Sequence, residues 1–246
     1  MPSCHHSYAR FSNSDTIVVF VHGIQGSPRQ FRNITSTIPK SIDYMCVLLP
    51  GHGCSLKSFR RNGRREWASY FSTLTIDLRK RYSRIYFVGH SMGCLIGIDA
   101  AVRGEIVFDG MLLVACPLRI RFNLRYLAMG LKAIKHQKPS NVYIRAMQDA
   151  NSIDIHNPLG LLTCIKPYAG LIALMIRANR HVLNLNTSVC MIQSDADEIV
   201  SARSAKVAAK NKRIKTIVVS ESSHFYYSSE ALSVIQCELA ALIQSN

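Results

Sequence analysis

A serine lies between two glycines where a predicted strand gives way to a predicted helix. Residues 85–88 are an apolar run of β-formers, and the residues after Gly93 are small or apolar at helical spacing. Residues 89–93 between them read G-x-S-x-G, a pattern that sets the serine on a sharp turn whose glycines let strand and helix approach closely. We therefore predict that Ser91 is a nucleophile, with an exposed hydroxyl at a helix N-terminus that favours negative charge.

A serine hydroxyl needs a nearby base, which is itself held by a carboxylate. In this type of strand–turn–helix site the expected chain order is serine, then an acid, then histidine. Ser91, Asp197 and His224 follow that order. Spacing alone does not separate Asp197 from Asp195. We predict Asp197 as the acid and expect Asp195 to hydrogen-bond its own turn.

A tetrahedral intermediate also needs preorganised donors for its negative oxygen. The backbone N–H of Met92, directly after the serine, is one candidate. The glycine-punctuated loop at residues 22–26 follows the first apolar strand and offers the N–H of Ile24 as the second. The alternative for this loop is a tight glycine turn with no catalytic role.

The remaining histidines have plainer interpretations. We expect His90, inside the serine turn, to be structural, and His52 to shape the loop at residues 50–53. His5 and His6 belong to a polar N-terminal tail, and a lone pair of histidines does not indicate a metal site. We therefore expect no metal.

Apolar strands alternate with amphipathic helices along the chain, which predicts a mostly parallel sheet with helices on both faces. The predicted strands are residues 16–21, 43–49, 85–88, 108–116, 188–193 and 214–219. Ligand sites in such sheets lie beyond the carboxyl ends of the strands. Ser91, Asp197 and His224 each follow a strand, as does the loop at residues 22–26. This convergence predicts one site.

The alternation stops after residue 117. Residues 118–166 contain amphipathic pieces, including Leu124, Leu127, Met129 and Leu131, and they predict a small inserted helical lid with an acyl-chain pocket. Residues 1–117 and 167–246 would then form one α/β core, which suits the chain's 246 residues.

The amino-acid composition indicates which partners and which cellular compartment to expect. The chain has 30 Lys and Arg against 15 Asp and Glu, a formal charge of +15, which would suit anionic membranes, nucleic acid or acidic substrates. No nucleic-acid motif accompanies the charge, so we expect a solvated basic surface with at most weak association with anionic membranes. Eight scattered cysteines without a C-x-x-C pair, and a start without a signal peptide, predict a cytoplasmic protein. Nothing indicates an oligomeric state.

Five segments of the sequence together resemble those of the α/β-hydrolase fold. More narrowly, they resemble its bacterial carboxylesterase and monoacylglycerol lipase-like branch. The matching segments, in order, are residues 22–26, 50–53, 89–93, 197–200 and 222–224. The resemblance implies ester hydrolysis without cofactor or metal. The apolar residues of the predicted lid suggest a short- or medium-chain acyl ester or a monoacylglycerol as the substrate. Two departures are the chain start, which leaves little room for the first two antiparallel strands of many members, and Gln193, where many carry glycine.

Three alternatives remain open within and beyond this resemblance. An acyltransferase or a carbon–carbon bond hydrolase would use the same Ser91, Asp197 and His224. A non-catalytic protein that binds an apolar ligand would use only the pocket.

Overall fold

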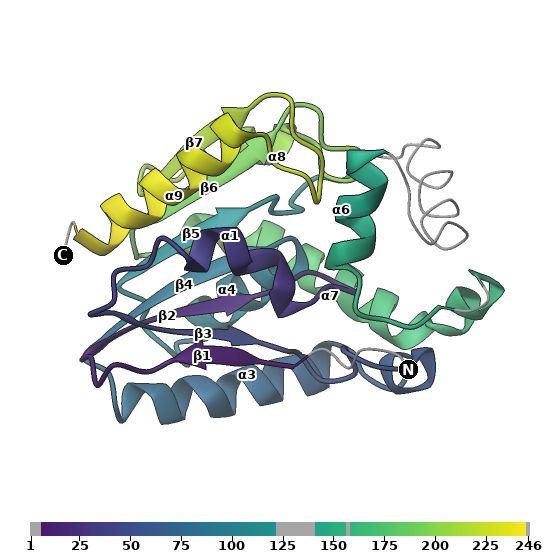
Figure 1. Ribbon diagram of the computed structural model, residues 1–246, viewed down its shortest axis with the longest axis horizontal. Helices are drawn as coiled ribbons and strands as arrows, with labels where there is room; N and C mark the ends of the chain where they lie inside the picture. Colours follow the sequence, from purple (N-terminus) through teal and green to yellow (C-terminus); the bar gives the residue numbers. More distant parts are fainter. Residues whose placement is uncertain (1–5, 122–140, 156–157, 245–246) are drawn as a thin grey trace.

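In the computed structural model, which describes residues 6–121, 141–155 and 158–244, the chain forms a seven-stranded sheet (Figure 1). The strands lie in the order β1-β3-β2-β4-β5-β6-β7, and all neighbours are parallel except β1, which runs antiparallel to β3. Their bounds are β1 Tyr8–Arg10, β2 Thr16–Val21, β3 Asp43–Val47, β4 Arg84–His90, β5 Gly110–Val114, β6 Val189–Ser194 and β7 Ile214–Val219.

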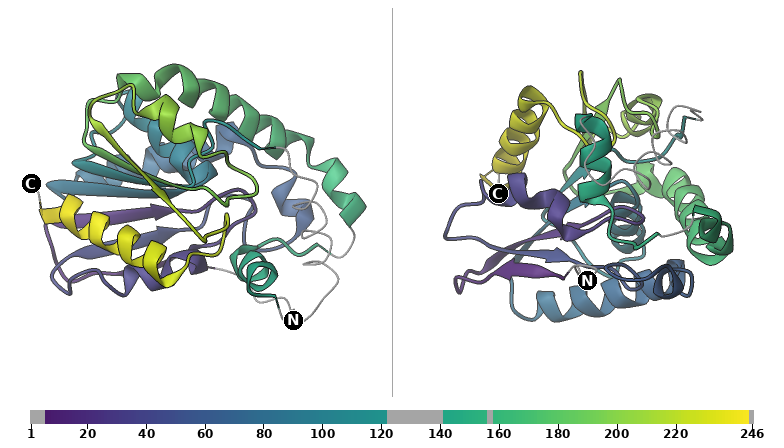
Figure 2. Two further views of the ribbon diagram at one scale, coloured as in Figure 1. Left: turned by 90° about the horizontal axis from the view of Figure 1, so that it is seen from above. Right: turned by 45° about the vertical axis from the view of Figure 1, so that its right-hand side comes forward.

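Helices cover both faces of the sheet, as Figures 1 and 2 show. The helices described are η1 Pro28–Phe31, α1 Arg32–Thr35, α2 Leu56–Phe59, α3 Arg64–Arg79, α4 Met92–Val102, α6 Val142–Ala150, η2 Pro158–Thr163, α7 Ile165–His181, η3 Val182–Asn184, α8 Arg203–Ala208 and α9 Ser229–Gln244. Helices α3, α4 and α7 pack on one face, and α1 and α9 on the other.

The strand sequences explain this two-sided burial. In β2, Ile17 and Val19 enter the core beneath α3 and α4, whereas Val18 and Phe20 enter the core beneath α1 and α9. Successive side chains of a strand point to opposite faces, so a strand buried on both sides is apolar at every position. The predicted fold class, a mostly parallel α/β sheet covered on both faces, is confirmed.

Two elements differ from the prediction. The N-terminal tail contains the short edge strand β1, held by the Arg10 side chain, which donates to the carbonyls of Ile38 and Ile42. Helix α7 begins at Ile165, just inside the region predicted as the lid, residues 118–166. Pro167 lies in its first turn, where a backbone N–H has no intrahelical partner, so the proline does not break the helix.

The region predicted as a lid, residues 118–166, is described only in part. Helix α6 and η2 belong to it, whereas Leu124, Leu127, Met129 and Leu131 lie outside the described residues.

Among the described helices, none is both long and apolar enough to cross a membrane. Seven cysteines within the described ranges are free thiols.

Candidate active site

Ser91 occupies a strained turn between β4 and α4. Its backbone φ is 52° and ψ is −120°, a left-handed conformation that L-residues rarely adopt. The turn fits only because Gly89 and Gly93 lie two residues before and after the serine. A Cβ on Gly93 would overlap the carbonyl oxygen of Val21 in the adjacent strand. The hydroxyl was expected to be exposed, but Ser91 is only 7% exposed, because the loops after β2 and β7 close over the turn.

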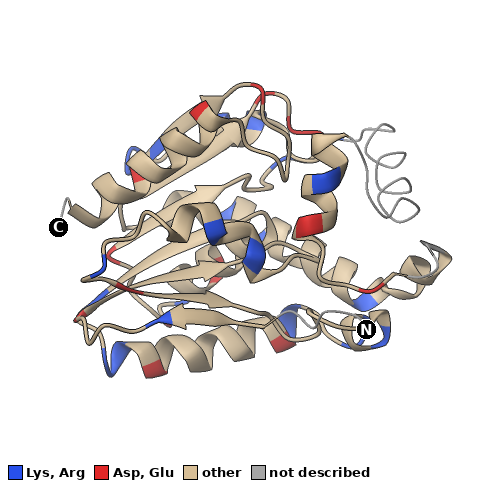
Figure 3. Cartoon of the chain, in the orientation of Figure 1, with Lys and Arg blue, Asp and Glu red and all other residues tan. Residues whose placement is uncertain are grey.

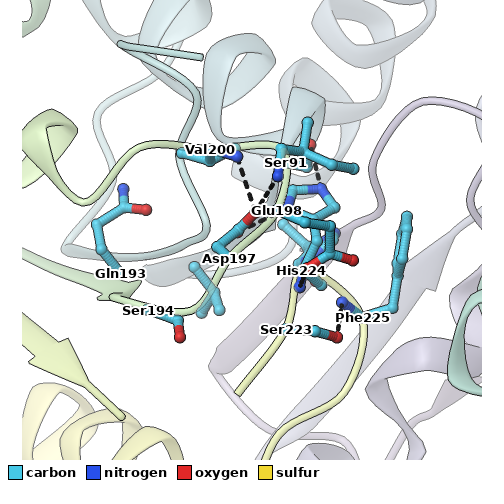
Figure 4. Close-up of polar contacts among 12 residues, drawn as sticks. Ser91, Gln193, Ser194, Asp197, Glu198, Val200, Ser223, His224 and Phe225 are labelled. Carbon is cyan, nitrogen blue, oxygen red and sulfur yellow. Dashed lines mark hydrogen bonds and ion pairs between the residues drawn. The ribbon is translucent and has the colours of Figure 1, made fainter. Parts of the chain in front are cut away.

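Three distant side chains form a hydrogen-bonded chain at the carboxyl edge of the sheet (Figure 4). Ser91 Oγ lies 3.0 Å from Nε2 of His224, and Nδ1 of His224 lies 2.8 Å from Oδ2 of Asp197. The second oxygen of Asp197 accepts from the backbone N–H groups of Ile199 and Val200, at 2.8 and 2.7 Å. The carboxylate therefore has a fixed orientation towards the imidazole.

The hydrogen-bond partners determine the protonation states of His224 and Asp197. A carboxylate only accepts, so His224 carries its proton on Nδ1 and leaves Nε2 to accept from the Ser91 hydroxyl. Burial lowers the pKa of His224, but the charge and hydrogen bond of Asp197 outweigh it, so the pKa is raised above 6.5. Burial raises the pKa of Asp197, yet His224 and the two backbone donors bring it below 3.8. Asp197 thus stays ionised beside a histidine whose protonated form it stabilises.

The other candidate acid points elsewhere. Asp195 accepts a hydrogen bond from the Ser220 hydroxyl at 2.9 Å, and its backbone N–H pairs with the carbonyl of Val219. The structure therefore brings Asp197, and not Asp195, to His224. Gln193, where a glycine was expected, lies in β6 and donates to the carbonyl of Cys116, so it does not displace Asp197.

The two predicted oxyanion donors, Ile24 and Met92, belong to the loop after β2 and to the start of α4. A Cβ on Gly23 would come within 3.0 Å of the Ser91 Cβ, so the loop after β2 passes directly beside the nucleophile. Within the described ranges, the backbone N–H groups of Ile24 and Met92 have no hydrogen-bond partner. Two donors next to the serine are therefore available to a negatively charged oxygen.

Two buried histidines shape that loop. Nε2 of His22 accepts from the backbone N–H of Leu49, and Nε2 of His52 accepts from the N–H of Gln25, both at 3.1 Å. The two rings lie edge to face with centroids 4.8 Å apart. Burial lowers the pKa of His52 to about 4, so it stays neutral and keeps accepting. His52 was predicted to shape its own loop at residues 50–53, and its Nδ1 does donate to the Pro50 carbonyl at 3.3 Å. Its contact with Gln25, next to Ile24, was not predicted.

The profile of the alpha/beta hydrolase family matches residues 18–235. The chain belongs to this family. A search of curated proteins finds no match to the sequence.

Solved structures agree with the family at the level of the fold. A metagenome-derived lipolytic enzyme from the LipS and LipT study shares 16% identity with a TM-score of 0.75, over 99% of each chain. The monoacylglycerol lipase of Paleococcus ferrophilus shares 16% identity with a TM-score of 0.70, over 98% of this chain and 99% of its own. Est1E of Butyrivibrio proteoclasticus, solved with ferulic acid, shares 15% identity with a TM-score of 0.65, over 97% and 95%.

Within this alpha/beta hydrolase site, sequence reasoning missed Glu198. Its carboxylate is buried and accepts a hydrogen bond from the backbone N–H of His224 at 3.1 Å. Burial raises the pKa of Glu198, and the neighbouring Asp197 charge adds to that effect. The residue directly follows the acid in the chain, but its contact depends on a loop 26 residues away, which spacing does not reveal.

His90 supports His224 from the other side. Its Nε2 donates to the carbonyl of His224 at 2.9 Å, and the two rings lie 4.9 Å apart. Burial lowers the pKa of His90 to about 3, so this ring stays neutral. The structural role predicted for His90 agrees with these contacts.

A cavity of about 490 Å³ lies beside the site, between η1, α6 and the segment after His224. His90, Phe225 and Tyr226 line it, and Ser91 does not. Among the described residues, no group of three or more His, Cys, Asp and Glu side chains could hold a metal ion.

Proposed function

We propose that this alpha/beta hydrolase family member is a serine hydrolase that cleaves carboxylic esters of short- to medium-chain acyl groups. The observation that carries the proposal is the continuous hydrogen-bonded chain from Ser91 through His224 to Asp197. A hydroxyl is a weak nucleophile at neutral pH, and a positioned imidazole with an ionised partner is the arrangement that activates it.

The contacts support the following reaction steps. Oγ of Ser91 attacks the acyl carbonyl while its proton passes to Nε2 of His224, and the N–H groups of Ile24 and Met92 hold the resulting oxyanion. The intermediate expels the alcohol, which takes the proton from His224 and leaves an acyl group on Ser91. Water then attacks this ester through the same base, which releases the carboxylic acid and restores the serine.

Asp197 acts through His224. Its ionised carboxylate holds the imidazole in the tautomer that presents a lone pair to Ser91, and it stabilises the imidazolium formed during each step. This geometry favours catalysis over the alternative of a protein that only binds an apolar ligand, because binding alone does not require a base on a buried serine.

The proposed substrate class is supported by the structural neighbours and by the lid predicted from the sequence. The structural neighbours include a lipolytic enzyme, a monoacylglycerol lipase and the protein Est1E with ferulic acid bound. We place the acyl chain beneath a lid formed by residues 118–166, over a core formed by residues 1–117 and 167–246. Free thiols throughout the described chain favour a reducing, cytoplasmic setting.

A panel of p-nitrophenyl esters with increasing acyl length, applied to the wild type and to Ser91→Ala, tests the proposal. We expect turnover that peaks at short or medium chains and disappears in the variant. A fluorophosphonate probe should label the wild type at Ser91, as located by peptide mass spectrometry. Added alcohol acceptors separate hydrolysis from acyl transfer, since a transferase would form a new ester in preference to the acid. A wild type that neither hydrolyses any ester nor reacts with the probe would contradict the proposal.

A further inference from the structure

One face of α7 is apolar and exposed. Ile165, Ala169, Ile172 and Ile176 are spaced i, i+4, i+7 and i+11, which places them on one side of the helix. Ile165 is 74% exposed and Ile172 is 56% exposed. The opposite side, which includes Leu174, is buried in the core against α3 and α4. A helix that is apolar on both sides indicates that its outer face has a partner.

The short helix η2 extends this face beyond the start of α7. Leu162 is 75% exposed and lies three residues before Ile165, and Leu159 lies three residues before Leu162. Residues three apart share a side of a 3₁₀ helix. The chain leading into α7 projects at one end of the molecule, on the right in Figure 1. We call the whole row the aliphatic stripe: Leu159, Leu162, Ile165, Ala169, Ile172 and Ile176.

Basic residues border the stripe where it begins. Nζ of Lys166, next to Ile165, donates to the carbonyl of Arg61 at 2.7 Å, which joins the first turn of α7 to the segment after α2. In Figure 3, Lys and Arg gather where α2, the start of α3 and the start of α7 meet. Lys166 is also ion-paired with the Glu66 carboxylate at 2.6 Å. We call the other exposed cations here the basic cluster: Lys57, Arg60, Arg61 and Arg65.

We propose that the aliphatic stripe and the basic cluster together dock the protein onto an anionic phospholipid bilayer. Aliphatic side chains that enter the acyl boundary and cations that meet the headgroups are the two signals that hold a protein at a membrane surface. The charge favours this partner over a second copy of the chain. Two copies joined through the stripe would bring two basic clusters together, each on a chain of formal charge +15.

Co-sedimentation with sucrose-loaded vesicles tests this surface without reference to catalysis. We expect the wild type to bind phosphatidylcholine vesicles that contain about one third phosphatidylglycerol, and to bind pure phosphatidylcholine far less. Salt at about 0.5 M, where screening acts within a few ångströms, should release it. The double variant Ile172→Ser, Ile176→Ser, on the part of the stripe outside residues 118–166, should bind about tenfold more weakly. Lys57→Gln with Arg60→Gln should weaken binding about 25-fold, since each cation near an anionic surface contributes about fivefold.

Matched controls use the same side-chain types elsewhere on the chain. Val107→Ser removes an aliphatic side chain that is 73% exposed, and Lys210→Gln with Lys212→Gln removes two exposed cations in the α8–β7 connection. Both controls should bind like the wild type, and all variants should keep the wild-type rate on a water-soluble ester. The proposal is wrong if the stripe variant binds like Val107→Ser. It is also wrong if the wild type sediments as a dimer that the stripe variant converts to a monomer.

Discussion

The carboxylate of Glu198 accepts a hydrogen bond from the backbone N–H of His224, while Asp197 accepts one from the imidazole of the same residue. Two consecutive acids thus hold the main chain and the side chain of one histidine. Burial alone lowers the pKa of His224, and the negative charges of Asp197 and then Glu198 raise it. Glu198 is therefore a positioning residue that also contributes to the basicity of the proposed base.

The Glu198→Gln variant separates these two effects. Glutamine keeps an oxygen that can accept from the His224 N–H but removes the charge. We expect near wild-type kcat at high pH and a lower pKa for His224, so that the acidic limb of the kcat/KM profile moves to lower pH. Glu198→Ala leaves the buried N–H without an acceptor, which should lower the free energy of unfolding by about 1–3 kcal/mol.

Glu221→Gln is the matched control, because Glu221 is an exposed acid in the loop that leads to His224. Its pH profile should overlay the wild type. An acidic limb that stays in place in Glu198→Gln would show that Glu198 holds the loop without influencing the imidazole.

Ser91→Ala should abolish ester hydrolysis and keep the fold. Removing the nucleophile of such a relay lowers kcat by about four orders of magnitude or more. The hydroxyl contacts His224 and carries none of the backbone hydrogen bonds that fix the turn, which come from the Ser91 N–H to Val114 and the Cys94 N–H to Ser91. We expect a Tm within a few degrees of the wild type, measured beside the residual rate on p-nitrophenyl butyrate. A variant that keeps wild-type activity would rule out Ser91 as the nucleophile.

The two neighbouring aspartates give a paired test of the acid. Asp197→Asn preserves size but donates where a carboxylate accepts, which turns His224 to the wrong tautomer, and a loss of about 10⁴ in kcat is expected. Asp195→Asn removes only an acceptor for the Ser220 hydroxyl and should leave kcat nearly unchanged. Steady-state kinetics of both variants at one pH decides between them. Equal losses would indicate that Asp197 has no special role.

The pH dependence of the wild type should reflect His224. The imidazole must be neutral to accept the serine proton, and its pKa is raised above 6.5. The value of kcat/KM should therefore fall as pH drops below that raised pKa. The acidic limb of the pH profile should fit the titration of a single proton. His90→Gln should leave the limb in place, because the pKa of His90 is about 3 and its ring is neutral throughout this range. A midpoint at or below 6.5 would contradict the raised pKa.

Much of the site could be predicted because parallel strands end at one edge. Apolar runs locate the strands, so the polar residues that directly follow them must lie near one another whatever the loops do. Ser91, Asp197 and His224 were found in this way, and the structure brings them within hydrogen-bond distance. Asp195 and Asp197 follow the same strand, and only the turn geometry separates them.

Other features carry no such periodic signal. The edge strand β1 is only three residues long and includes the charged Arg10. It is held by pairing with β3 and by Arg10 contacts with carbonyls about thirty residues away. The burial of Ser91 arises from loops that close over it, and the contact of Glu198 with His224 depends on one loop conformation. Long-range contacts made by irregular backbone leave no pattern in the sequence.

The close packing of the serine turn gives a stability prediction. Any side chain on Gly93 would collide with the backbone carbonyl of Val21, which is fixed in the sheet and cannot move aside. We expect Gly93→Ala to lower the free energy of unfolding by about 3 kcal/mol or more, measured by urea denaturation. Gly104→Ala is the control: its φ is +70°, but a Cβ there would meet nothing within 4 Å. It should lower the free energy of unfolding by about 1 kcal/mol, from backbone strain alone. A loss for Gly93→Ala no larger than that for Gly104→Ala would show that β2 and α4 can move apart to accept a side chain at residue 93.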